Sequence, residues 1–159
     1  MIRINYQSDF AIAVTLKDAA GQTVTPPTDH AWSIHVTDIA GTCWRCGFDG
    51  TTYEDCSIDG NTIICYIDNP GFVPGQATIT FKDDIPDTHF ADGYENIVVP
   101  AGGVFLWNGA SDTGEAVDVN MVINMIAPQI TGASIDAAGD LNFVINYTNT
   151  QVENNGNDN

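Results

Sequence analysis

Short segments of alternating apolar and polar residues run through nearly the whole chain, and no window sustains a helical period. In the clearest segment, Phe10, Ile12, Val14 and Leu16 alternate with smaller or polar residues. A period of two is typical of a β-strand that buries one face. The sequence therefore predicts an all-β protein, which lacks the helix termini and helical motifs that many enzymes use to bind phosphate and metal ions.

The alternating segments predict a series of strands joined by tight turns at Gly, Asp, Asn and Pro. Residues 82–96, which contain many acidic residues, are predicted to form a long polar loop. Strands at this spacing favour an antiparallel β-sandwich of the immunoglobulin-like or jelly-roll-like kind, with a small closed barrel as the alternative. The predicted strands are 3–6, 10–16, 23–25, 32–36, 43–48, 56–58, 62–67, 76–81, 97–99, 104–107 and 117–126.

Three segments differ in composition. Residues 1–127 are predicted to form the sandwich, and the Ala-Pro step at 127 and 128 marks its end. Residues 128–148 predict a β-hairpin extension with strands at 130–135 and 141–147. Residues 149–159 are rich in Asn and acidic residues, which is typical of a flexible tail.

One face of the predicted hairpin is apolar, because Leu141, Phe143, Ile145 and Tyr147 occupy alternate positions of its second strand. Two strands alone are barely stable in water. We therefore expect these four residues to make an interaction surface, either with the main domain or with other chains.

Charge limits the partners. The chain has 4 basic residues against 21 acidic ones and a formal net charge of −17, so it would repel nucleic acid and anionic lipid. No run approaches the ~18 apolar residues of a membrane span, and the N-terminus lacks the pattern of an export signal. We expect no nucleic-acid partner, no membrane partner and no export by a signal of its own.

Two kinds of metal site have some support in the sequence. Cys43 and Cys46 have the spacing of half a zinc site, which Cys56 and Cys65 could complete, but on a strand Cys43 and Cys46 would face opposite ways. Buried thiols are the preferred interpretation, and a Cys56–Cys65 disulfide would not persist in a cytoplasm. The predicted loop offers calcium ligands at Asp83, Asp84, Asp87 and Asp92 without EF-hand spacing, so a solvated loop is preferred.

Catalytic patterns are lacking as well. His30, His35 and His89 are scattered, with no nucleophile motif beside them. The acidic pairs 54–55 and 83–84 are sequence neighbours, which face apart on a strand. The sequence predicts no catalytic residue, no cofactor and no metal site, and therefore a protein that is not an enzyme.

Several short motifs carry a resemblance. The opening Ile4-Asn5-Tyr6-Gln7-Ser8-Asp9-Phe10, the turn at 17–21, and the later elements at 85–87 and 90–93 resemble small virion proteins of tailed phages and prophages of Bacteroides-type gut bacteria. Residues 128–141 are similar to the short β connectors of phage fibre and appendage proteins. Because the chain ends soon after this connector, the resemblance implies an attachment, decoration or adaptor subunit rather than a whole fibre.

The resemblance implies a non-enzymatic structural protein of the virion, made in the bacterial host cytoplasm. Its partners would be other capsid or tail proteins and further copies of itself, with a trimer as one arrangement. The alternative is a carbohydrate- or cell-surface-binding module in which Trp32, Trp44 or Trp107 is a stacking platform, although core packing suits each residue better. A secreted adhesin domain is a third interpretation, which would need an export signal elsewhere.

Overall fold

The computed structural model describes residues 1–123, 129–135 and 137–146. Within these residues the regular elements are all strands, which confirms the all-β prediction. None of the described residues belongs to a helix long and apolar enough to cross a membrane. The strands are β1 (Ile2–Asn5), β2 (Phe10–Lys17), β3 (Thr23–Val24), β4 (Trp32–Thr37), β5 (Cys43–Phe48), β6 (Tyr53–Glu54), β7 (Cys56–Asp59), β8 (Thr62–Ile67), β9 (Gly75–Pro86), β10 (Tyr94–Trp107), β11 (Val117–Val122), β12 (Gln129–Ile135) and β13 (Leu141–Asn146).

The chain divides into two compact units, Met1–Ile123 and Asn124–Asn159. The predicted end of the sandwich at residue 127 falls within 124–128, outside the described residues. The predicted tail, 149–159, and the last residue of the predicted hairpin strand, Tyr147, also lie outside them.

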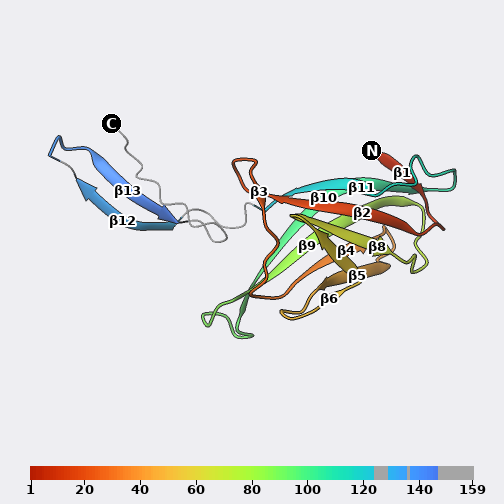
Figure 1. Ribbon diagram of the computed structural model, residues 1–159, viewed down its shortest axis with the longest axis horizontal. Helices are drawn as coiled ribbons and strands as arrows, with labels where there is room; N and C mark the ends of the chain where they lie inside the picture. The colour runs from red at the N-terminus through yellow and green to blue at the C-terminus, as the bar shows by residue number, and fades with distance from the viewer. Residues whose placement is uncertain (124–128, 136, 147–159) are drawn as a thin grey trace. The chain divides into compact units, whose positions relative to one another are not determined.

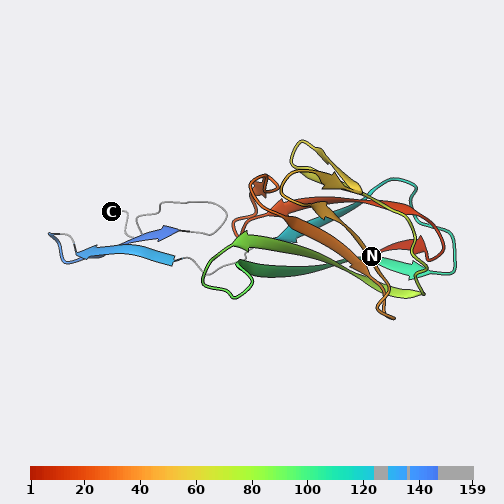
Figure 2. The ribbon, with the colours of Figure 1, turned by 90° about the horizontal axis from the view of Figure 1, so that it is seen from below.

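Two sheets form the first unit (Figure 1). One has six strands in the order β1-β10-β9-β4-β5-β6, and the other has the order β11-β2-β8-β7 with β3 beside β2. Figure 2 shows the same strands after a quarter turn. The predicted β-sandwich is confirmed, and each sheet also contains one parallel pair, β1 with β10 and β11 with β2.

The core lies between the two sheets and follows the predicted alternation. In β2, Ile12, Val14 and Leu16 are fully buried. In the facing sheet, the inner residues of β4, β5 and β9 are almost fully buried, and the sulfur atoms of Cys46 in β5 and Cys65 in β8 lie 3.4 Å apart across the core. Burial of one face of each strand supplies most of the stability of such a sandwich.

The prediction of a long loop at 82–96 is wrong. Strands β9 and β10 continue as an antiparallel ribbon from Val98 opposite Lys82 to Tyr94 opposite Pro86, and only 87–93 form the turn. This turn projects at one end of the sandwich (Figure 1). The charged residues suit a strand because they alternate between faces: Asp83 points into the core, whereas Lys82 and Asp84 do not.

Two turns of the first unit use the same hydrogen bonds. The Asp18 carboxylate accepts from the amides of Ala20 and Gln22, at 2.9 Å each. In the turn between β4 and β5, Asp38 accepts from the amides two and four positions later, at 2.9 and 2.8 Å. Asp38 is buried and also accepts from the Val73 amide at 2.9 Å, so it links its turn to the segment before β9.

The second unit contains the predicted hairpin, a two-stranded sheet of β12 and β13. The strands are antiparallel, and the register shifts between Ile130 and Gly132. Gly139 in the connecting turn has a φ of 85°, which a glycine adopts without strain.

Candidate interaction surface

The predicted interaction residues lie mostly in β13. Leu141, Phe143 and Ile145 pair in register with Ile135, Ala133 and Ile130 of β12. The fourth predicted residue, Tyr147, lies outside the described residues. The backbone therefore places the first three at alternate positions of one strand of a two-stranded sheet.

A second surface is the side of the six-stranded sheet that is turned away from the core. We call this side of β1, β10, β9, β4 and β5 the outer face. Along β10 it exposes Tyr94, Val98 and Phe105, which have relative exposures of 45%, 57% and 40%. Exposed apolar residues that lie along one strand are more informative than scattered ones, because monomeric proteins keep such patches small.

The outer face also carries three of the four Lys and Arg residues of the chain: Arg3, Arg45 and Lys82. Register places Lys82 opposite Val98, and Arg3 opposite Phe105, so basic and apolar side chains are neighbours. Each basic residue is near one acidic side chain, with N–O distances of 3.2 Å for Arg3–Asp112, 3.8 Å for Arg45–Glu54 and 3.8 Å for Lys82–Asp84. The chain as a whole has a net charge of −17, but on the outer face these basic side chains balance their acidic neighbours.

A serine and a histidine meet on β4, and no sequence motif pointed to this pair. Ser33 Oγ lies 2.9 Å from His35 Nε2, and His35 Nδ1 lies 3.6 Å from the Cys43 sulfur. Burial, followed by the positive charges of Arg45 and Lys82, lowers the pKa of His35. Ser33 is only 4% exposed and packs against Gly47. Its hydroxyl therefore serves as the hydrogen-bond partner of His35 and is not accessible to a substrate.

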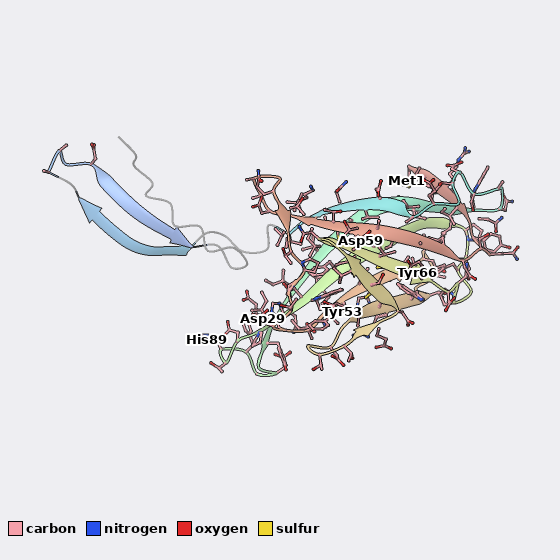
Figure 3. All side chains as sticks on the ribbon, viewed as in Figure 1. Met1, Asp29, Tyr53, Asp59, Tyr66 and His89 are labelled. Carbon is pink, nitrogen blue, oxygen red and sulfur yellow. The ribbon has the colours of Figure 1, made fainter. Side chains whose placement is uncertain are left out.

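His30 and Asp83 make a buried hydrogen-bonded contact at the end of the core, where the β9–β10 ribbon begins. His30 Nε2 lies 2.5 Å from Asp83 Oδ1, and His30 Nδ1 lies 2.7 Å from Asp29 Oδ1. Asp83 is fully buried and its Oδ2 has no hydrogen-bond partner. Burial raises the pKa of Asp83, although His30 opposes the shift. Figure 3 labels Asp29 near the ribbon turn that carries His89.

The aspartates considered as calcium ligands do not converge. Asp87 accepts from the His89 amide at 2.8 Å and Asp92 accepts from the Tyr94 amide at 3.1 Å, so both hold the ribbon turn. Asp83 and Asp84 lie on opposite faces of β9. Among the described residues, no group of three or more His, Cys, Asp or Glu is arranged to hold a metal ion.

The four cysteines differ in burial because they lie on different faces of their strands. Cys43 is exposed, whereas Cys46 and Cys65 are fully buried and Cys56 is half-buried opposite Cys65. The expected opposite orientation of Cys43 and Cys46 is confirmed, and it separates the four thiols that a zinc site would need. All four cysteines are free thiols.

The three tryptophans are used in packing. Trp32 is 1% exposed and Trp44 is 8% exposed, which confirms that they are core residues. Trp107 is half-buried on the outer face, where the Arg3 guanidinium lies 4.4 Å from its ring centre and its Nε1 donates to Ala110 O at 3.0 Å. Carbohydrate binding through Trp107 stays a prediction, and it would require Arg3 to move from the ring.

Comparison with known proteins gives no relative. No protein-family model, curated protein or solved structure matches this chain. The function has to be argued from the surfaces that the fold presents.

Proposed function

We propose that this chain is a non-enzymatic structural protein of a phage particle, which acts as a decoration, adaptor or fibre-attachment subunit on the capsid or tail. The observation that carries the proposal is the two-stranded sheet of β12 and β13. In general, a two-stranded hairpin without further partners is marginally stable in water, and the edges of such a hairpin present N–H and C=O groups that another strand can pair with. Strands from other chains would satisfy those groups and bury its apolar positions.

Leu141, Phe143 and Ile145 are the hairpin residues assigned to this contact, together with Tyr147 from the sequence. They alternate along β13, and a row of this kind can be buried by one partner surface. Copies of the same chain arranged around an axis would bury the row symmetrically, which favours a cyclic homo-oligomer such as a trimer.

The outer face is assigned to the contact between the sandwich and a capsid or tail protein. Exposed Val98 and Phe105 supply apolar area, and their basic neighbours Lys82 and Arg3 reduce the repulsion that a chain of net charge −17 otherwise exerts. A mixed apolar and charged surface is common in protein interfaces, where electrostatic complementarity selects the partner.

The experiment is the protein composition of particles released by the bacterium that encodes this chain. We expect the chain to co-purify with intact particles through a density gradient, and antibodies against Met1–Ile123 to label capsids or tails in electron micrographs. Particles of normal composition that lack the chain, from cells that express it, would contradict the proposal. A Val98→Asp and Phe105→Asp double variant is expected to accumulate in the cell and be lost from particles.

A further inference from the structure

Three cysteines from both sheets meet in the core. Cys46 comes from β5 of the six-stranded sheet, and Cys56 and Cys65 come from β7 and β8 of the other. The Cys46 and Cys65 sulfurs are 3.4 Å apart, and Cys56 lies opposite Cys65 in register. The Cys56 thiol donates to the backbone oxygen of Gly47, the residue after Cys46, at 3.5 Å. We call these three residues the thiol cluster.

The members of the thiol cluster differ in access. Cys46 and Cys65 are fully buried, whereas Cys56 is half-buried at the edge strand of its sheet. Interaction with the Cys46 thiol, followed by burial, raises the pKa of the Cys56 thiol. Reagents can therefore reach the cluster through Cys56, but the reactive thiolate is scarce and the reaction is slow.

We propose that the thiol cluster is a disulfide-exchange site at which oxidation joins Cys46 to a cysteine of the opposite sheet, with Cys56 reacting first. The site is independent of the proposed role in a phage particle. In a reducing cytoplasm the three thiols stay free, and the bond forms when the protein meets a disulfide oxidant outside it.

Oxidised glutathione would supply the oxidising equivalents in two exchange steps. The Cys56 thiolate attacks one sulfur of the oxidant, the glutathione S–S bond breaks, and one glutathione leaves and is protonated. Cys46, after losing its proton to solvent, attacks the Cys56 sulfur of this mixed disulfide and releases the second glutathione. The protein loses two hydrogen atoms, and one glutathione disulfide becomes two glutathione thiols. Cys65, after losing its proton to solvent, can then attack the Cys46 sulfur of this bond, which breaks the Cys46–Cys56 bond and releases Cys56 as a thiolate that is protonated. The new Cys46–Cys65 bond still joins the two sheets.

The geometry requires a modest change. A disulfide has an S–S length of about 2.05 Å, so sulfurs that now lie 3.4 Å apart must approach. Rotation of the cysteine side chains about χ1 can bring the two sulfurs together. This rotation disturbs the structure less than a shift of one sheet against the other. The new bond would restrain the unfolded chain, so we expect the melting temperature to rise by at least about 4 °C.

The test uses the full chain with Cys43→Ser, which removes the exposed thiol and prevents links between chains. The protein is incubated with oxidised glutathione, the remaining thiols are alkylated, and the chain is cut before aspartate residues. This cleavage places Cys46 on 38–48, Cys56 on 55–58 and Cys65 on 59–67, so mass spectrometry identifies each link. We expect 38–48 joined to 55–58 or to 59–67.

A second variant tests the order of the steps. Adding Cys56→Ser leaves only the fully buried Cys46 and Cys65, and we expect the inter-sheet bond to form at least about tenfold more slowly. A link between 55–58 and 59–67 alone, or three alkylated cysteines after prolonged oxidation, would overturn the proposal. An unchanged rate with Cys56→Ser would overturn the role of Cys56.

Discussion

Single aspartate side chains stabilise turns of this sandwich by accepting hydrogen bonds from backbone amides. Asp38 also connects its turn to a distant segment of the chain. It accepts three backbone amides, two from its own turn and one from Val73. The related turn at Asp18 accepts two amides from its own turn only. The two residues therefore form a natural comparison between a local turn and one that is tied to a distant segment.

We expect Asp38→Ala to lower the free energy of unfolding by about 2–3 kcal/mol, because the part-buried Val73 amide and two turn amides lose a charged acceptor. Asp18→Ala is the matched control, with an expected cost of about 1 kcal/mol. Urea denaturation followed by tryptophan fluorescence measures both values. Equal losses in the two variants would show that the bond to Val73 adds nothing.

Acid should reduce the contribution of Asp38 to the free energy of unfolding. Burial alone would raise the pKa of Asp38, but its amide donors and the Thr42 hydroxyl lower it overall. A carboxyl group with a lowered folded-state pKa adds stability above its unfolded pKa of about 3.9 and loses it as the pH falls through the folded-state value. We expect the stabilities of the natural protein and Asp38→Asn to differ at pH 7, and the difference to shrink as the pH falls below about 4 and through the lowered folded-state pKa of Asp38. A constant difference across this range would contradict the assignment.

His30 and Asp83 form the second critical pair. Removing one partner of a buried hydrogen-bonded pair leaves the polar group of the other without a partner, so His30→Ala should cost about 1–3 kcal/mol. Replacing both residues, as His30→Leu with Asp83→Leu, should recover much of this loss because the site lies at the end of an apolar core. His89→Ala is the control, since that side chain is 89% exposed and also contacts an aspartate. A loss equal to that of His89→Ala would refute the buried-pair interpretation.

At the scale of elements, β4 and β5 approach too closely for any side chain at Gly47. A Cβ there would lie 2.4 Å from Trp32 O and 3.0 Å from Ser33 Cα, both backbone atoms that cannot rotate away. We expect Gly47→Ala to cost about 1–3 kcal/mol or more by thermal denaturation. Gly114→Ala, with open space around the added methyl group, should leave the melting temperature nearly unchanged.

Most strands could be predicted because their alternation is local. Cys43–Phe48 and Thr62–Ile67 begin and end as expected, since each has a buried row and a defined turn on both sides. The extension of β9 could not be predicted, because Asp83 carries a polar carboxyl group and only its contact with His30, 53 positions away, explains its burial. The parallel pairing of β1 with β10, and of β11 with β2, depends on the fold of the whole chain and leaves no local signal in the sequence.

The same limit applies to the surfaces. The alternating apolar residues Leu141, Phe143 and Ile145 could be identified from the sequence because they lie within one strand. The thiol cluster and the outer face each combine residues from strands that are distant in the chain, so sequence spacing could not identify them. The spacing of Cys43 and Cys46 is also that of half a zinc site, an interpretation less favoured than buried thiols, and the strand places these two residues on opposite faces.

At the scale of the whole molecule, we assign assembly to the hairpin and docking to the sandwich. The two roles can be separated experimentally, because Met1–Ile123 and Asn124–Asn159 are distinct compact units. A Leu141→Asp and Phe143→Asp double variant should abolish self-association while the sandwich keeps its melting temperature. Matched changes at the neighbouring positions, Asn142→Asp and Val144→Asp, should have a smaller effect on association.

The mass of the full chain in solution, measured by light scattering across a range of concentrations, tests the assembly role of the hairpin. We predict a discrete oligomer of the 17.0 kDa chain, such as a trimer, which becomes a monomer when the chain stops at Ile123. A full-length chain that stays monomeric at the highest concentration would contradict the claim that other chains complete the hairpin.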